Sequence, residues 1–280
     1  MVHNNLSGQQ TALPFQCPLH VACKPHHSCA FEHYGPYWTY YSHKSIDSMI
    51  QNLIIYLTLF TMSVQPKSLS VPYVPELDNC DLETAAKILD EKGTRRSIDT
   101  LNWKEQYPYR PLTSFSIAHS DTHIYVEFFV RCNYLRAVNY TNNSPVHQDS
   151  CVEFFVAPNG SQPYYNFEMN CIGTLHAACR MDRHNGTPLT DEQLAQVRRY
   201  ASCGNRPFNE LEGMFSWSTV MAIPLELIGL KYEGKPITIR GNFYKCADLT
   251  SSPHFLSWAP IDTPEPDFHR PEFFGEITLE

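Results

Sequence analysis

The clearest pattern in the chain is an alternation of apolar and polar positions in short segments after residue 100. Between His123 and Cys132, every second residue is apolar, from Ile124 to Val130. A period of two predicts a half-buried β-strand. Similar aromatic and β-branched runs predict strands over 150–157, 164–172, 174–181, 214–223, 237–246 and 274–279. In the run 164–172, the period places Glu168 and Asn170 on the same face.

Three short segments have helical signals instead. Apolar residues at 82, 85, 86 and 89 share one helical face, with Asp81 able to cap the first turn and Gly93 able to end the last. Thr190 and Gln193 form a capping box before a second short helix. Pro224 suits the first position of a third. Many short strands with two or three short helices predict a mainly β fold, an antiparallel β-sandwich or barrel.

The first 61 residues differ from the rest of the chain. They hold four charged residues, Lys24, Glu32, Lys44 and Asp47, but six of the 13 histidines and three of the 10 cysteines. No strand or helix period is visible before residue 45. We therefore interpret 1–61 as a poorly ordered N-terminal extension and 62–280 as one domain.

An apolar run over 45–64 leaves three hypotheses open. It is shorter than the roughly 20 residues of a spanning helix, and it lies too far from the N-terminus, without flanking basic residues, for an ordinary signal peptide. The segment could be spurious upstream translation with Met62 as the true start, which implies a cytoplasmic protein. It could be a buried or interfacial helix. It could also be an anchor or export signal beginning at Met49, which implies an exported or membrane-anchored protein.

Composition excludes several classes of function. Aromatic residues make up 13% of the chain and charged residues 18%, unlike a disordered protein. The net charge is −8 without a block of Lys and Arg, so we expect no nucleic-acid partner. The 10 cysteines include no CxxC pair, which argues against a disulfide scaffold or a zinc ribbon. No G-x-S-x-G motif is present for a hydrolase serine.

Carboxylates and aromatic side chains are the remaining candidates for chemistry. Glu153 and Glu168 on successive strands could be the acid and base of a glycosidase, or simply solvated. Asp149 and Glu153 could supply oxygen ligands for calcium together with other loop residues: Asp121, Asn142 and Asn143. The last 26 residues interleave proline with Phe255, Trp258, Phe268, Phe273 and Phe274, which could present rigid aromatic surfaces for stacking on sugar rings. Polar neighbours for sugar hydroxyls would be Asn170, Glu168, His269, Arg270 and Asn242.

Five motifs in order resemble carbohydrate-binding module family 9, in the form common in Bacteroidales. They are QDSCVEFF at 148–155, YYNFEMNCIGT at 164–174, WSTVMAIP at 217–224, RGNFY at 240–244, and SW at 257–258 followed by FHRPEFFGEI at 268–277. The order and spacing fit from about residue 101 to residue 280, whereas 1–61 has no counterpart.

The resemblance implies a β-sandwich that binds sugar and is not itself catalytic. Members of the family hold the end of a glucan or xylan chain between two Trp rings, and some carry structural calcium. Here Val146 and Phe268 stand at the two Trp positions, Glu168 replaces an Arg, and Asn170 is kept. The predicted ligand site comprises Phe268, Trp258, Asn170, Glu168, Glu153 and His269; Asp149 is the candidate calcium ligand, and no catalytic residue or other cofactor is expected.

Two alternative functions remain. The protein could be a component of a glycoside hydrolase system for polysaccharide catabolism, since the family occurs attached to xylanases. It could also be a sandwich whose site has drifted to a protein-interaction role. A domain of about 219 residues leaves little room for a separate catalytic domain, which favours binding of an oligosaccharide or polysaccharide. We expect no membrane partner unless residues 49–64 anchor the chain.

Overall fold

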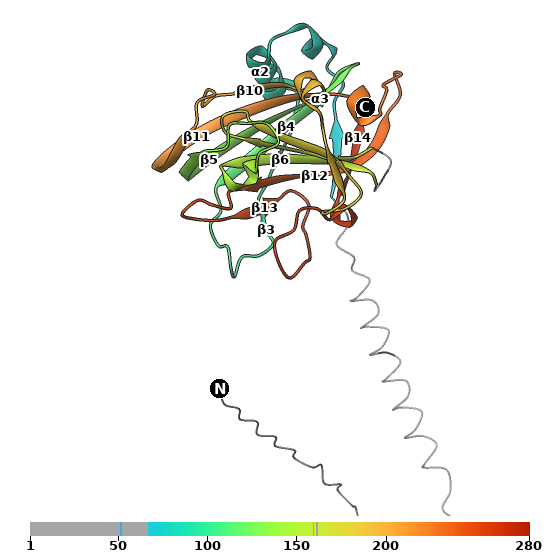
Figure 1. Ribbon diagram of the computed structural model, residues 1–280. Coiled ribbons are helices and arrows are strands. Elements are labelled where there is room, and N and C mark those ends of the chain that lie inside the picture. The colour runs from blue at the N-terminus through green and yellow to red at the C-terminus, as the bar shows by residue number, and fades with distance from the viewer. Residues whose placement is uncertain (1–50, 52–66, 159, 161) are drawn as a thin grey trace, which may run out of the picture. The chain divides into compact units, whose positions relative to one another are not determined.

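The computed structural model describes residues 67–158, 160 and 162–280, together with residue 51 (Figure 1). The chain divides into two units between residues 63 and 64, and every element below belongs to the second. The predicted extension 1–61 and nearly all of the apolar run 45–64 lie outside the described residues. Within the described part of the chain, no helix is both long and apolar enough to cross a membrane.

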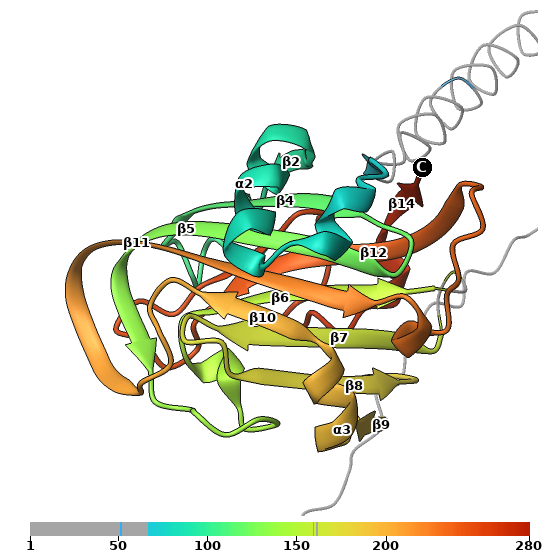
Figure 2. The same ribbon diagram turned by 90° about the horizontal axis from the view of Figure 1, so that it is seen from above.

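Two β-sheets pack face to face, which confirms the predicted sandwich (Figures 1 and 2). The larger sheet has the strand order β1-β14-β12-β6-β7-β8-β9, and β13 and β3 join it beside β12. Its strands are β1 (Ser68–Val71), β3 (Thr100–Leu101), β6 (Cys151–Ala157), β7 (Tyr164–Asn170), β8 (Leu175–Arg180), β9 (Gly186–Pro188), β12 (Ile237–Cys246), β13 (Phe255–Ser257) and β14 (Gly275–Leu279). Its pairs are antiparallel except β1 with β14.

The smaller sheet has the order β10-β11-β5-β4-β2, and all its pairs are antiparallel. Its strands are β2 (Thr94–Ser97), β4 (Leu112–His119), β5 (His123–Ala137), β10 (Arg198–Ala201) and β11 (Phe208–Pro224). The strands β5 and β11 are longer than their alternation predicts because they pair with each other through two register shifts. The strand β4 was not predicted, since its three polar residues Thr113, Ser114 and Ser116 obscure the apolar period.

Two of the three predicted helices are confirmed; the third is only a short 3-10 turn, and Pro224 ends the strand β11 instead of beginning a helix. The helix α2 (Leu82–Lys92) begins after Asp81, whose side chain accepts a hydrogen bond from the Thr84 amide at 2.7 Å. The helix α3 (Asp191–Gln196) begins with the full capping box of Thr190 and Gln193. The segment after Pro224 forms a 3-10 turn, η3 (Glu226–Ile228). Three further 3-10 turns are η1 (Pro75–Asn79), η2 (Val146–Gln148) and η4 (Pro271–Phe273).

A stack of aromatic rings joins the two sheets at the centre of the core. The ring of Phe243 on β12 stacks on Phe115 from the smaller sheet at 3.7 Å between centroids. On its other side it stacks on Phe154 of β6 at 4.6 Å. All three side chains are buried, so the stack removes a large apolar area from water at the point where the sheets meet.

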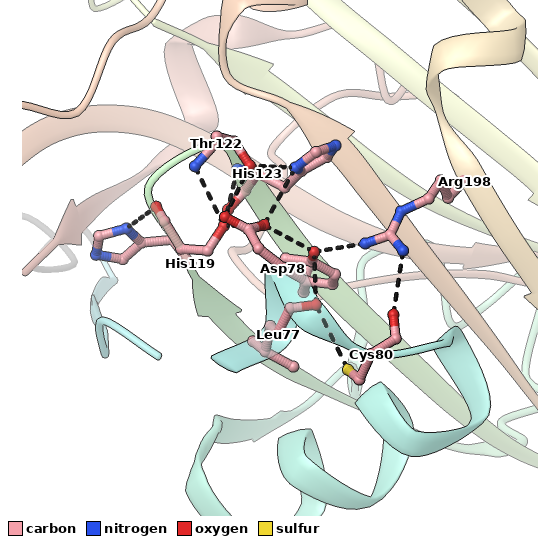
Figure 3. Close-up of polar contacts among 9 residues, drawn as sticks. Leu77, Asp78, Cys80, His119, Thr122, His123 and Arg198 are labelled. Carbon is pink, nitrogen blue, oxygen red and sulfur yellow. Dashed lines mark hydrogen bonds and ion pairs between the residues drawn. The ribbon is translucent and has the colours of Figure 1, made fainter. Parts of the chain in front are cut away.

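The outer face of the smaller sheet is covered by α2 and η1. Figure 2 shows α2 lying over this sheet, and its apolar residues Ala85 and Leu89 pack with Tyr125 and Val220. Beside them, the Asp78 carboxylate of η1 accepts hydrogen bonds from the hydroxyls of Ser120, Thr122 and Tyr125 at 2.7–3.0 Å (Figure 3).

This Asp78 network fixes η1 to the sheet. Burial raises the pKa of Asp78, but the three hydroxyl donors outweigh it and hold the pKa below its ordinary value. Arg198 of β10 extends the network by donating to the Tyr125 hydroxyl at 2.6 Å and to the Cys80 carbonyl at 3.2 Å (Figure 3). Because every charged group in it already has partners, we interpret this network as structural.

The outer face of the larger sheet is covered by loops on the side opposite α2 (Figure 1). The segment 247–274 crosses this face, and the segment after β3 holds it in place. Asn102 accepts from the Ile261 amide at 2.8 Å, and the Trp103 indole donates to the Thr263 carbonyl at 2.8 Å. Strand β6 is consequently buried along its whole length on both faces, an environment that usually excludes charged groups.

The aromatic stack yields a stability prediction. Phe243→Ala should lower the free energy of unfolding by about 3–5 kcal/mol, because it opens a cavity between the sheets. The matched control is Phe129→Ala, since Phe129 is 38% exposed on the smaller sheet; it should cost about 1 kcal/mol or less. Chemical denaturation of both variants measures the difference, and equal losses would show that the stack does not join the sheets as described.

Candidate functional site

A pocket of about 140 Å³ lies on the covered face of the larger sheet. Strands β6, β7 and β12 form its floor, and the residues after β13 form one wall. The lining residues combine acids, histidines, a thiol and aromatic rings: His147, Glu153, Glu168, Arg183, Cys246, Asp248, Phe255, Pro266, Asp267, Phe268 and His269.

The register of the sheet places the acidic residues in a single row across the floor. Directly opposed positions on β12, β6, β7 and β8 are Tyr244, Glu153, Glu168 and His176. The period of two that directs Phe154 and Phe167 into the core directs Glu153 and Glu168 to the opposite face. The structure brings these two glutamates together, and they are buried rather than solvated.

A chain of hydrogen bonds orients Glu168. Its Oε1 accepts from the Asn166 side chain at 2.9 Å, and the Asn166 oxygen accepts from Arg180 Nε at 2.7 Å. Its Oε2 lies 3.9 Å from Nδ1 of His147. Burial raises the pKa of Glu168 to about 7, although Arg180 and the Asn166 bond oppose the rise.

Glu153 has a more apolar environment. Its Oε1 accepts a hydrogen bond from the Cys246 thiol at 3.1 Å. Burial raises the pKa of Glu153 well above its ordinary value, and the neighbouring Glu168 charge raises it further. The raised pKa favours the uncharged carboxyl form of Glu153, which can both donate and accept a hydrogen bond. Burial also raises the pKa of Asp248, at the rim of the floor, to about 6.

The aromatic wall is formed around Phe268. Its ring stacks on Tyr244 at 4.2 Å with an interplanar angle of 8°, and the Tyr244 hydroxyl donates to the Phe268 carbonyl at 3.1 Å. Next to it, His269 packs on Phe155 at 4.9 Å, and its Nδ1 lies 3.1 Å from the Tyr164 hydroxyl. Burial lowers the pKa of His269 to about 3, so its ring is neutral. Phe268 is only 9% exposed, so its ring acts mainly as packing for the wall.

Four of the six predicted ligand residues line the pocket: Phe268, Glu168, Glu153 and His269. Asn170 does not; its side chain donates to the Asn139 carbonyl and to Asp149, and its oxygen accepts from the Ile172 and Thr174 amides. It shapes the turn after β7 instead.

The placement of Trp258 at the ligand site is corrected by the structure. Its ring is 2% exposed and lies in the core between the sheets, 5.8 Å from Phe243 and 6.2 Å from Phe115. It packs directly over Gly275, where a Cβ would meet the Trp258 ring at 2.5 Å. The close approach requires glycine at 275 and leaves Trp258 unable to contact a ligand.

The calcium hypothesis at Asp149 is also not supported by the geometry. The buried carboxylate accepts from the Val138 and Asn139 amides at 3.0 and 2.9 Å and from the Asn170 side chain at 3.0 Å. Arg136 lies 3.3 Å away as its ion pair. Both oxygens thus face N–H donors, which a bound cation would have to displace, so Asp149 does not fit a calcium site.

Several pocket residues were not predicted. Asp248 follows the end of β12, and His147 follows Val146, whose side chain is fully buried beneath the aromatic wall. Cys246 lies on the pocket face of β12, but in the sequence it looks like any other small apolar residue of a buried strand. Arg183 and Asp267 form an ion pair at 3.1 Å across the rim. These residues come from separate loops, and sequence periods carry no information on which loops meet.

Comparisons with known proteins agree with this architecture. The model of carbohydrate-binding family 9 matches residues 83–279. A Bacteroides uniformis protein described as carbohydrate-binding is 40% identical, with a TM-score of 0.73 over 77% of this chain and 100% of that one. Family 9 modules of Caldicellulosiruptor kristjanssonii in complex with glucose and with cellotriose are 15% identical, with TM-scores of 0.46 and 0.42 over 76% of this chain and 96% and 94% of theirs. A search of curated proteins finds no match.

The raised pKa of Glu168 predicts a pH dependence of stability. Between its ordinary pKa of 4.5 and about 7, the folded protein holds a proton that the unfolded chain has released, so the free energy of unfolding falls as pH rises. As pH rises from 5 to 8, release of the proton held by Glu168 should lower the free energy of unfolding by about 2–3 kcal/mol. Glu168→Gln should remove this contribution and make the profile less steep, whereas the exposed Glu276→Gln should not.

Denaturation of the three proteins at pH 5 and pH 8 measures this effect. The low pKa values of His176 and His269, about 4 and 3, act in the opposite direction at acidic pH, but these residues are present in every sample and cancel in the comparison. A Glu168→Gln profile parallel to that of the parent would contradict the buried, protonated Glu168.

Proposed function

Because the chain belongs to carbohydrate-binding family 9, we propose that its pocket binds the end of a plant-type glucan or xylan oligosaccharide without cleaving it. The observation that carries the proposal is the row of two buried carboxyl groups, Glu153 and Glu168, on the floor of a pocket with aromatic walls. The similarity to the Bacteroides uniformis protein supports the same class of ligand.

The floor is suited to a polyol. Each sugar hydroxyl both donates and accepts hydrogen bonds, and so does an uncharged carboxyl group. The raised pKa of Glu153 favours this uncharged form, while Glu168, held by Asn166, offers oriented acceptor oxygens. Because Glu153 and Glu168 are buried, these bonds form with little competition from water.

The walls indicate modest affinity for a single terminal residue. Phe268 and Phe255 present ring edges, but the two-Trp clamp of the family is absent, since Val146 is fully buried and Phe268 packs on Tyr244. A pocket of 140 Å³ is also smaller than the roughly 300–1,000 Å³ of typical drug-sized ligand sites. We expect dissociation constants in the millimolar to micromolar range, roughly −4 to −8 kcal/mol.

The arrangement of the acids favours binding over hydrolysis. A glycosidase needs two carboxyl groups on either side of the scissile bond, about 5–9.5 Å apart. Glu153 and Glu168 are directly opposed neighbours on one face of one sheet, so both approach a ligand from the same side.

Calorimetric titration with glucose, xylose and their short β-linked oligomers tests the proposal. Glu153→Leu and Glu168→Leu should each weaken binding about tenfold or more, because each removes at least one buried hydrogen bond to the sugar. The exposed Glu276→Gln is the control and should bind like the parent.

Reducing-sugar release is measured on the same panel. The proposal predicts none above background. Unchanged sugar binding in both leucine variants would show that this pocket is not the binding site. Release of reducing sugar by the parent, lost in those variants, would show that the protein is a hydrolase.

A further inference from the structure

Two thiols that sugar binding does not use lie at the pocket floor, Cys246 lining it and Cys151 beside it. Cys151 on β6 and Cys246 on β12 are directly opposed in the sheet, and both are buried on the pocket face. One ligand atom each of Cys151, Cys246 and Glu153 lie within 4.8 Å of one another, and the Cys246 sulfur lies 3.1 Å from Glu153 Oε1.

Basic side chains compensate the acids around this cluster only at a distance. Among the described residues, neither Lys nor Arg forms an ion pair with Glu153, Glu168 or Asp248. Arg183 is paired with Asp267. Asp248 Oδ1 is buried without a hydrogen-bond partner in the described part of the chain, and Asp248 lines the same pocket.

The nearest lysine points the other way. Lys245 lies between Tyr244 and Cys246 on β12, so its side chain enters the core, where its ammonium lies 6.0 Å from the Trp217 ring and 2.9 Å from His254 Nε2. Lys245 thus lies on the core face of β12, whereas Cys246 lies on the pocket face beside Glu153.

We propose that Cys151, Cys246 and Glu153 form a binding site for a zinc-like divalent cation on the floor of the pocket. Zinc accepts both sulfur and carboxylate oxygen ligands, the two types that this cluster offers, whereas calcium and magnesium prefer oxygen ligands alone. In a tetrahedral zinc site the donor atoms lie roughly 3.4–3.8 Å apart, so the three groups need only small side-chain adjustments.

The fourth position faces the pocket. His147 and Glu168 line the same pocket, and a water molecule there can complete the coordination. Binding releases the two thiol protons and the Glu153 carboxyl proton to solvent. Burial raises the pKa of the Cys151 thiol to about 12, so metal affinity should increase with pH.

Metal titration of the full reduced chain tests the site without any sugar, so its result is independent of the proposed function. Metal-free protein is titrated with Co²⁺, and Zn²⁺ is then added to displace it. The parent should give the absorption of tetrahedral cobalt with a sulfur-to-cobalt charge-transfer band. Cys151→Ser and Cys246→Ser should each lose one bound equivalent, and Glu153→Gln should weaken binding about tenfold. Cys179→Ser, half-buried on β8 outside the cluster, is the matched control and should bind like the parent.

Zinc X-ray absorption of the unmodified chain keeps the test valid if the serine variants do not fold. The proposal predicts a zinc shell with two sulfur and two lighter ligands. The proposal would be overturned if the parent failed to bind zinc, or if the zinc shell held no sulfur or three or more sulfurs. Equal binding by the parent and all three cluster variants would also overturn it. The last result would assign the metal to other cysteines or histidines of the chain.

Discussion

The burial of β6 on both of its faces is the constraint on which the rest of this structure depends. A sandwich strand ordinarily has one face in the core and one in water. Here the segment 247–274 covers the second face, so residues that alternate toward it are withdrawn from solvent as fully as the core. This cover converts an ordinary strand position, Glu153, into a buried carboxyl with a raised pKa, and it converts an open sheet face into a pocket.

The covering segment 247–274 is held in place by long-range contacts, which offset the unfavourable free energy of forming it. Ordering a loop of this length is entropically unfavourable, and burying carboxyl groups without a cation is unfavourable as well. The stacked pair of Tyr244 and Phe268, and the two bonds made by Asn102 and Trp103, hold the loop against the sheet. The aromatic stack of Phe243 holds the sheets together independently of the pocket, so the site can carry unfavourable groups without unfolding the domain.

The sequence predicted the features that depend on local periodicity, which are the strands, the helix starts and the faces of the strands. Alternation identified β6, β7 and β12 and placed Glu153 and Glu168 on faces that meet, and the caps at Asp81 and Thr190 located both helices. It could not predict which aromatic residues of the proline-rich segment face the core and which face the pocket, because neither the strand period nor the helix period applies there. Phe268 and Trp258 looked equivalent as loop residues, yet one faces the pocket and the other lies beneath Gly275 in the core. His147, Cys246 and Asp248 likewise reach the pocket through register and loop packing, which only the folded chain defines.

Carbon-13 NMR of the glutamate carboxyl carbons tests most directly whether this covered face is a buried acidic site that binds sugar. Spectra recorded across pH 4 to 9 resolve the buried glutamates from the exposed ones, and assignment follows from Glu153→Gln and Glu168→Gln. The account predicts that Glu168 titrates near pH 7, that the pKa of Glu153 lies well above its ordinary value, and that both signals shift when a binding oligosaccharide is added while that of Glu276 does not. Titration of both glutamates near pH 4.5, or a sugar-induced shift confined to other carboxyl groups, would contradict it.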